Sequence, residues 1–328
     1  MKKKILICGA TGFIGRNMVE QLSRHKDMEI FAVRYTRPEY EVSNSANPVK
    51  WLQADLRNPS DVARVTNEVD IIIQAAATTS GAKDILSRPY IHVTDNAVMN
   101  SYLLREAFEK KIKHFIFFSC TVMYQSSVVA LKESDWNESV PIHQRYFGVG
   151  NTKTYIEKML EFFSGISDMK TTAIRHSNVY GPHDKFDLER SHVFGATITK
   201  VMAAIDTILV WGDGEEERDL LYVDDLVRFV ELAILHQTPK FRLYNCGLGQ
   251  KTSIKSLVEK IIKLSGKNVE VKHDLSQPTI KTSLFLDNSL ALNEIGWSPQ
   301  VGLEEGIIKT LKWWKDNIDP VTRVVRND

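Results

Sequence analysis

Three glycines near the N-terminus have the spacing of a phosphate-binding turn, G-x-x-G-x-x-G. Gly9, Gly12 and Gly15 follow an apolar run at 5–8 and precede a segment whose apolar residues recur with helical spacing. Glycines let the backbone approach a pyrophosphate closely, and a helix N-terminus supplies aligned N–H groups with partial positive charge. A tight turn without a ligand would also use glycine, but the order strand, turn, helix favours binding. The sequence therefore predicts a dinucleotide site at residues 9–15.

The residues after the next strand-like run, 30–33, indicate which dinucleotide is bound. An acidic residue at this point accepts the ribose hydroxyls of NAD, whereas arginine accommodates the 2′-phosphate of NADP. The chain has Arg34-Tyr35-Thr36-Arg37 and no acid there. Two solvated surface arginines would give the same pattern. We expect NADP(H) as the cofactor, with NAD as the less favoured alternative.

Strand-like and helix-like segments alternate through the first half of the chain and must position this turn. Apolar runs at 5–8, 30–33, 70–76 and 114–119 predict buried strands, and helical spacing appears at 13–22 and 96–109. Such alternation predicts βαβ units, hence an α/β fold with a Rossmann-type doubly wound parallel sheet. The C-terminal ends of its strands, and any ligand, then lie along one edge.

The second half is less regular. It contains a further strand at 172–174, a loop-rich stretch at 183–214, a helix opening at 223–226, a strand at 243–247, a helix ending at 296–299 and another helix at 303–314. We see no Pro/Gly/Ser linker, so two domains with an extended interface are expected. The first is a dinucleotide-binding domain, 1–181 with about 222–248 added. The second is a smaller C-terminal α/β substrate-binding domain, 182–221 and 249–328.

Three further stretches are specific enough to suggest a family. They are Asn178-Val179-Tyr180-Gly181-Pro182-His183-Asp184-Lys185-Phe186, Val210-Trp211-Gly212-Asp213-Gly214, and Arg218-Asp219-Leu220-Leu221-Tyr222-Val223-Asp224-Asp225. With the glycine turn and Lys153, they resemble the extended short-chain dehydrogenase/reductase (NAD-dependent epimerase/dehydratase) family over residues 4–315. Within that family the chain is most similar to the GDP-L-fucose synthase branch. The resemblance implies chemistry on a nucleotide-linked sugar.

The resemblance also implies roles for individual residues. Lys153 matches the lysine that holds the nicotinamide ribose, and Arg218 matches an arginine that pairs with the diphosphate of a sugar nucleotide. Asp55 matches an adenine contact, although a loop aspartate that caps the next helix would look the same. The implied catalytic residues are Cys120, Thr121, Lys153 and His192. The implied cofactor contacts are Gly9, Thr11, Gly12, Phe13, Ile14, Gly15, Arg34, Arg37, Asp55, Leu56, Ala75, Ala76 and Lys153. The implied substrate contacts are Asn178, His192, Lys200, Trp211 and Arg218.

Two acid–base positions of the family have lost their chemistry in this chain. The family reads Tyr-x-x-x-Lys where this sequence reads Val149-Gly150-Asn151-Thr152-Lys153, and the cysteine that the synthases use for epimerisation falls at Val122. Losing one general acid typically costs about 10²–10⁴ in rate. At a third position an arginine becomes Lys200, which keeps the charge but loses the planar fork.

Three side chains could substitute for the missing tyrosine. Cys120 takes the position of the family's Ser/Thr and, near Lys153, could be acidic enough to act. Tyr146 precedes Val149 by about one helical turn, and His192 could protonate an oxygen. Each has an ordinary structural alternative: a small buried strand-end residue for Cys120, a helix-entry packing residue for Tyr146, and a residue outside the site for His192.

Two functions remain open. The first is an NADP(H)-dependent oxidoreductase or epimerase that acts on a nucleotide-linked 4-keto or hydroxy sugar, with GDP as the favoured nucleotide. The second is a catalytically degenerate protein that binds the cofactor or the sugar nucleotide and reports to a partner. Epimerisation alone is disfavoured, because Val122 removes one member of the acid–base pair.

Composition and cysteine content limit the classes of protein and the cellular location that we expect. The chain has 328 residues, a formal net charge of +1 and 25% charged residues, which gives no basic footprint for nucleic acid. The sequence contains no run of about 18 apolar residues, so we expect no membrane helix. The apolar run after Lys2-Lys3-Lys4 is too short for a secretory leader. The scattered cysteines Cys8, Cys120 and Cys246 suit reduced thiols in the cytoplasm. The residues His176, His183 and Asp184 fit no metal-ligand template. A homodimer through the helices at 96–109 and 152–163 is implied by the resemblance.

Overall fold

The fold is built on a parallel sheet of seven strands. The computed structural model describes residues 2–78, 90–188, 191–276 and 282–318. The strands run in the order β11-β6-β5-β4-β1-β2-β3, so the strand order reverses next to β1, as the doubly wound prediction requires. Their bounds are Lys3–Cys8 (β1), Met28–Arg34 (β2), Lys50–Gln53 (β3), Ile71–Gln74 (β4), His114–Phe118 (β5), Lys170–His176 (β6) and Phe241–Cys246 (β11). The predicted α/β class is confirmed.

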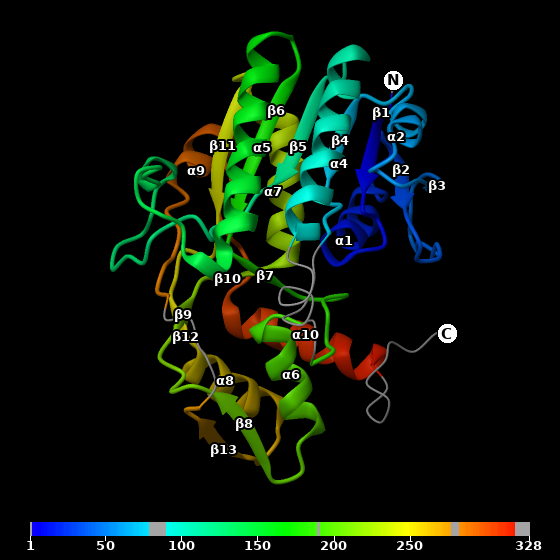
Figure 1. Cartoon of the computed structure of the whole chain (residues 1–328). Helices are drawn as coiled ribbons and strands as arrows, with labels where there is room; N and C mark the ends of the chain where they lie inside the picture. The colour runs from blue at the N-terminus through cyan, green and yellow to red at the C-terminus, as the bar shows by residue number, and fades with distance from the viewer. Residues whose placement is uncertain (1, 79–89, 189–190, 277–281, 319–328) are drawn as a thin grey trace.

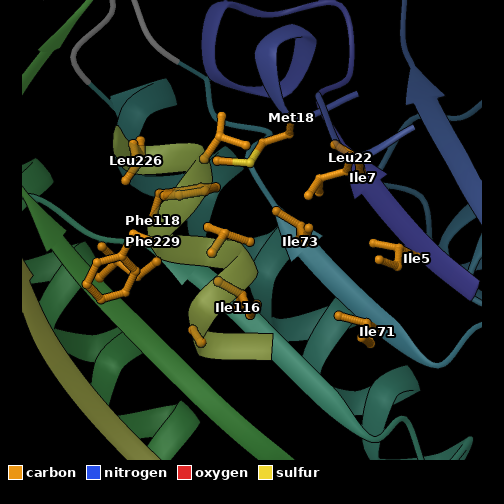
Figure 2. Close-up of a cluster of buried hydrophobic side chains, with 14 of the residues drawn as sticks. Ile5, Ile7, Met18, Leu22, Ile71, Ile73, Ile116, Phe118, Leu226 and Phe229 are labelled. Carbon is orange, nitrogen blue, oxygen red and sulfur yellow. The ribbon is translucent and has the colours of Figure 1, made fainter. Parts of the chain in front are cut away.

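Helices cover both faces of the sheet (Figure 1). On one face lie α1 (Phe13–Leu22), α7 (Val223–His236) and α9 (Ser289–Ile295), and on the other lie α2 (Pro59–Val65), α4 (Tyr90–Glu109) and α5 (Phe147–Gly165). Alternate residues of β1 serve the two cores: Ile5 and Ile7 face α1 and α7, whereas Leu6 and Cys8 face α4 and α5. Figure 2 shows the first of these cores, where Met18 and Phe229 meet the strand side chains. No helix among the described residues is long and apolar enough to cross a membrane.

A smaller lobe lies beyond the C-terminal ends of the strands (Figure 1). It consists of α6 (Val193–Ala203), β8 (Thr207–Trp211), α8 (Ile254–Ser265), β13 (Glu270–Asp274) and α10 (Leu303–Asn317), which share a third apolar core. Four short strands in two pairs join the lobe to the sheet. The strand β7 (Asn178–Tyr180) pairs with β10 (Leu220–Tyr222), and β9 (Glu217–Arg218) pairs with β12 (Thr252–Ser253). The domain boundaries inferred from the sequence stay a prediction.

The prediction of a loop-rich stretch at 183–214 was wrong. The stretch contains α6 and the strand β8, which pairs with β13. Gly195 and several β-branched residues give α6 a low intrinsic helix propensity. Packing overrides that propensity, since Phe194, Ile198 and Val201 recur at helical spacing and are buried in the core of the small lobe.

Asp184, at the start of this stretch, is a buried carboxylate with incomplete hydrogen bonding. One of its oxygens accepts a hydrogen bond from the Lys185 backbone N–H at 2.7 Å. The other, Oδ2, has no hydrogen-bond partner among the residues that the structure describes. Burial raises the pKa of Asp184 to about 7, so the folded protein holds this proton more tightly than the unfolded chain does.

We therefore expect Asp184 to destabilise the fold as pH rises. Its unfolded pKa is about 3.9, so the unfolded state loses the proton first, and stability present below about pH 4 is lost progressively up to about pH 7. Relative to wild type, Asp184→Asn should gain about 1 kcal/mol in free energy of unfolding per pH unit over that window. Urea unfolding at pH 4.5, 6 and 7.5 measures this, with the exposed Asp206→Asn as control. A difference between wild type and Asp184→Asn that is constant with pH would contradict it.

Candidate active site

The glycine turn forms only because two of its glycines lack a Cβ. Gly9 has a φ of +72°, and a Cβ there would lie 2.7 Å from the backbone of Ala76 at the end of β4. A Cβ at Gly15 would lie 2.1 Å from the Gly9 carbonyl oxygen. Gly12 is the N-cap of α1, so the turn brings the N-terminal amides of α1 to the point where the strand order reverses. Thr11, Phe13, Ile14, Ala75 and Ala76 lie in or beside this turn.

The residues predicted to select the cofactor lie beside the same turn. The Arg37 guanidinium donates to the Thr11 carbonyl oxygen at 3.0 Å, and Arg34 ends β2. Asp55 accepts hydrogen bonds from the Arg57 backbone N–H and from its Nε and Nη2 atoms at 2.9–3.0 Å. These bonds hold the pKa of Asp55 below its usual value. Asn58, and not Asp55, caps α2, which removes the ordinary reading of Asp55 as a helix cap. Leu56 is buried next to it.

Lys153 reaches from α5 to the end of β5. Its Nζ donates to the Phe118 carbonyl oxygen at 2.6 Å. Burial lowers the pKa of Lys153, while Cys120 and Glu157 oppose that shift. Burial also raises the pKa of the Cys120 thiol, and Lys153 offsets this only in part. The prediction of an acidified thiol was therefore wrong, because desolvation outweighs the neighbouring ammonium. Cys120 stays a neutral thiol at pH 7.

A buried polar network lies behind these residues and joins four elements. Glu157 on α5 accepts from Ser119 at 2.5 Å and from the Nε and Nη2 atoms of Arg175 at 3.0 and 2.7 Å. Arg175 on β6 also donates to the Tyr124 hydroxyl at 3.1 Å, which in turn donates to Asn245 on β11 at 2.8 Å. Sequence reasoning missed Arg175. Its signal was available, since it is a charged residue inside an otherwise buried strand.

A cavity of about 190 Å³ opens at the C-terminal edge of the sheet, next to Cys120. It collects three residues of the predicted site, Thr121, Asn178 and Arg218. The full lining is Thr121, Val122, Tyr124, Gln125, Ser126, His143, Tyr146, Asn178, Arg218, Asp219, Thr282 and Leu284. Arg218 is oriented by Thr282, whose carbonyl and hydroxyl oxygens accept from Nη1 at 2.9 and 2.7 Å. Burial lowers the pKa of Arg218, and the nearby Tyr146 and Glu216 oppose this shift.

Three predicted substrate residues do not line this cavity. His192 is the exposed N-cap of α6. Lys200 donates to the Leu209 carbonyl oxygen at 2.8 Å, and its ammonium lies 5.7 Å from the centre of the Trp211 ring. Lys200 and Trp211 thus contact each other on the small lobe. Conversely, sequence reasoning did not assign Gln125, Ser126, His143, Asp219, Thr282 or Leu284 to the site. They come from loops and strand ends far apart in the sequence, and no local pattern marks them.

Aliphatic side chains pack around the start of α5 on the Val122 side of the cavity. A Cβ on Gly150 would lie 2.9 Å from Ile142 and 3.6 Å from Val122. Gly150 follows Val149, so the start of α5 packs against aliphatic side chains. None of these groups can transfer a proton. Proton transfer in the cavity would have to come from other side chains.

A glycine turn between the first strand and the first helix, at the point where the strand order of a parallel sheet reverses, is typical of a Rossmann-type dinucleotide-binding protein. The chain belongs to the NAD dependent epimerase/dehydratase family, whose model matches residues 5–247. It is 28% identical to GDP-L-colitose synthase of Yersinia pseudotuberculosis, over 95% of this chain and 97% of that one. It is 29% identical to dTDP-4-dehydro-6-deoxy-D-allose reductase of Streptomyces sp, over 95% and 96%. It is 25% identical to GDP-L-fucose synthase of Azorhizobium caulinodans, also over 95% and 96%.

Solved structures share the fold. UDP-glucose 4-epimerase of Thermotoga maritima, solved with UDP-glucose, superposes with a TM-score of 0.84 at 24% identity, and the match covers 95% of this chain and 99% of that one. This likeness confirms the α/β architecture. The family match and the relatives confirm the sequence-based assignment to the epimerase/dehydratase family and its resemblance to GDP-L-fucose synthase.

We expect Gly15→Ala to disable the dinucleotide turn. The added Cβ meets backbone at 2.1 Å, so the turn must open, and helix α1 must shift away from Gly9. Whichever of NADH and NADPH the wild type binds should then bind at least about tenfold more weakly, a loss of about 1.4 kcal/mol. Thermal shift with titration of that cofactor measures this. Gly302→Ala is the matched control, because a Cβ there meets nothing within 4 Å. Equal affinity of Gly15→Ala and wild type for that cofactor would contradict the assignment.

Proposed function

We propose that this protein is an NADP(H)-dependent oxidoreductase or epimerase of a nucleotide-linked sugar. The observation that carries the proposal is the cavity that places Thr121, Asn178 and Arg218 beside the end of β5, where Lys153 is anchored. The turn needs glycine at positions 9 and 15, because a Cβ at either would collide with neighbouring backbone, and the N-terminus of α1 that follows the turn supplies donors for a pyrophosphate. When bound there, the nicotinamide cofactor would exchange hydride with a sugar carbon.

The chain's own residues have defined tasks in this proposal. Lys153 holds the nicotinamide ribose, and Thr121 orients the sugar oxygen. Asn178 and Arg218 bind the sugar nucleotide, with the guanidinium on its diphosphate. Cys120, His192, Lys200 and Trp211 remain proposed site residues. The last three lie on the small lobe, outside the cavity.

We favour NADP(H) over NAD as the cofactor. Arg34 and Arg37 lie at and just after the end of β2, and residues 34–37 include no carboxylate; Glu39, two residues further on, lies 4.0 Å from Arg34. Arg37 already contacts the glycine turn through Thr11. A 2′-phosphate would add a charge-assisted partner for these arginines. The substrate we propose is a GDP-linked 4-keto or hydroxy sugar, because two of the relatives carry GDP-sugar names; a dTDP-linked sugar is the alternative suggested by the third.

A second function has a specific observation in its favour. Val122, Ile142 and the start of α5 form an apolar wall where the family places its proton-transfer groups. A catalytically degenerate protein that binds the cofactor or sugar nucleotide and signals to a partner would tolerate such a wall. The reducing compartment implied by the free thiols Cys8, Cys120 and Cys246 leads us to propose a cytoplasmic setting for either function.

Stabilisation by ligands tests whether the protein binds both NADP(H) and a nucleotide sugar, as the proposed functions require. A ligand at about a hundred times its Kd adds about 2.7 kcal/mol of apparent stability. We expect stabilisation by NADP(H) and, additively, by one class of nucleotide sugar in a panel of GDP-, dTDP-, UDP- and CDP-sugars. Arg218→Gln should remove the sugar-nucleotide response and keep the NADP(H) response, whereas Gly15→Ala should do the reverse. Absence of any sugar-nucleotide response in wild type would refute the proposed substrate class.

We also propose a homodimer through α4 and α5, which lie side by side on one face of the molecule (Figure 1). The large apolar side chains Phe162 on α5 and Ile166 just after it are 60% and 52% exposed, and Val98 on α4 is 38% exposed. Such side chains on neighbouring helices suit a helix–helix contact between copies.

Phe162→Glu should therefore convert the dimer to a monomer, because it would place two symmetry-related carboxylates in an apolar interface. Sedimentation velocity across a concentration series measures the shift. Ile308→Glu is the control, since Ile308 on α10 is also more than half exposed, at 52% against 60% for Phe162, but lies on the small lobe. A monomeric wild type at micromolar concentration, or an unchanged dimer for Phe162→Glu, would rule out this interface.

A further inference from the structure

Tyr146 sits at the entrance to α5, one helical turn before the valine that replaces the family's tyrosine. It ends the short 3₁₀ helix η2 (Gln144–Tyr146) and is the N-cap of α5. Its backbone N–H donates to the His143 carbonyl oxygen at 2.7 Å, and its ring lies 5.9 Å from the His143 ring. These contacts fix the entrance to the helix, so the phenol is held in a defined place.

Tyr146 is the residue that directly precedes α5, seven residues before Lys153. Tyr146, Val149 and Lys153 are separated by three and four residues, a spacing that aligns side chains along one helix face. The phenol therefore lies one turn closer to the N-terminus than the missing tyrosine. At that place it lines one cavity with Arg218, whereas Lys153 is not among the lining residues.

The surroundings of Tyr146 are those of a sugar site. It lines the same cavity as Thr121, Asn178 and Arg218. The other phenol in the described lining, Tyr124, has its hydroxyl committed to Asn245 and Arg175 in the buried network. Tyr146 is thus the phenol placed to meet a ligand in this cavity.

The other two candidates for proton transfer fit less well. Cys120 does not line the cavity, and its thiol is held by the end of β5 near Lys153. His192 is exposed at the start of α6 and does not line the cavity either. The geometry therefore separates Tyr146 from both alternatives.

We propose that Tyr146 transfers the proton to and from the sugar oxygen in this cavity. This role rests on the proposed function. In the reducing direction, hydride addition to the sugar carbon pushes the carbonyl electron pair onto oxygen, and the Tyr146 hydroxyl gives that oxygen its proton. The phenolate left behind shares the cavity with the Arg218 guanidinium and regains a proton from solvent. In the oxidising direction, the phenolate accepts the proton of the sugar hydroxyl as hydride leaves the carbon.

Tyr146→Phe tests this role. It should lower kcat by about 10²–10⁴, the usual loss for a general acid–base group. With the cofactor absent, it should also weaken the Kd for the stabilising nucleotide sugar by up to about tenfold, the loss of one hydrogen bond to the sugar. Calorimetry gives that Kd independently of turnover. Tyr102→Phe, on α4 and packed against the far side of the sheet, is the control and should change neither quantity.

A double variant keeps the test informative if the single variant loses activity for structural reasons. Val149→Tyr combined with Tyr146→Phe returns a phenol to the fourth residue before Lys153. We expect the kcat of the double variant to be at least about tenfold higher than that of Tyr146→Phe. The thermal transition of each variant checks that it is folded. Recovery would support proton transfer by a phenol on this helix face.

The outcomes separate the two levels of the proposal. In the first outcome the wild type turns over a nucleotide sugar, and the kcat and Kd of Tyr146→Phe are within twofold of the wild-type values. This result overturns the role of Tyr146 and leaves the proposed function standing. Binding of NADP(H) and a nucleotide sugar by wild type without turnover overturns proton transfer by Tyr146 and favours the degenerate binding protein. No binding of any nucleotide sugar overturns the proposed substrate class and, with it, the role of Tyr146.

Discussion

The buried ion pair between Arg175 and Glu157 is the contact on which the rest of the site depends. The two side chains are 2% and 4% exposed. Removing two charges from water costs several kcal/mol per ion unless each is fully paired. Here Glu157 accepts from Arg175 and Ser119, and the Arg175 guanidinium lies 5.1 and 5.0 Å from the centres of the Tyr124 and Trp136 rings. The pair therefore locks α5, β5 and β6 in one arrangement. That arrangement sets where Lys153 meets the end of β5.

This dependence does not extend to positions 122 and 149. Val122 and Val149 are not members of the network, so a valine at either position leaves its hydrogen bonds intact. Glu157 also acts on the nearby charges: it opposes both the lowering of the Lys153 pKa by burial and any acidification of Cys120. The site thus keeps a half-buried lysine near a thiol whose pKa is raised by burial. Such a site can hold ribose hydroxyls even where the chemistry of the family has changed.

Sequence reasoning succeeded where the signal is local and periodic. The strand β1, the glycine turn and α1 follow from one apolar run and three glycines, and α7 was marked by Asp224 and Asp225 in its first turn. It failed where long-range contacts decide. The helix α6 forms because Phe194, Ile198 and Val201 pack against α8 and α10, which lie far along the chain. The position of Cys120 was predictable, but its pKa was not, because desolvation is set by the assembled fold. The cavity likewise depends on His143 and Thr282, which only the tertiary structure brings together.

Asp219 anchors the part of the cavity lining that contains Arg218. Its buried carboxylate accepts backbone N–H groups from Leu248, Gly249 and Leu286 at 2.7–3.1 Å, so it ties the loop after β11 and the segment at 286 to the residue next to Arg218. Burial raises its pKa to about 6 in spite of these bonds. The orientation of Arg218 is therefore a by-product of how the small lobe is attached to the sheet. A retained Arg218 argues for a binding site shaped for a diphosphate, and it argues equally for an enzyme and for a sensor. The distinction between them lies in proton transfer, and hence in which side chain reaches the sugar oxygen across the apolar wall of Val122 and Ile142.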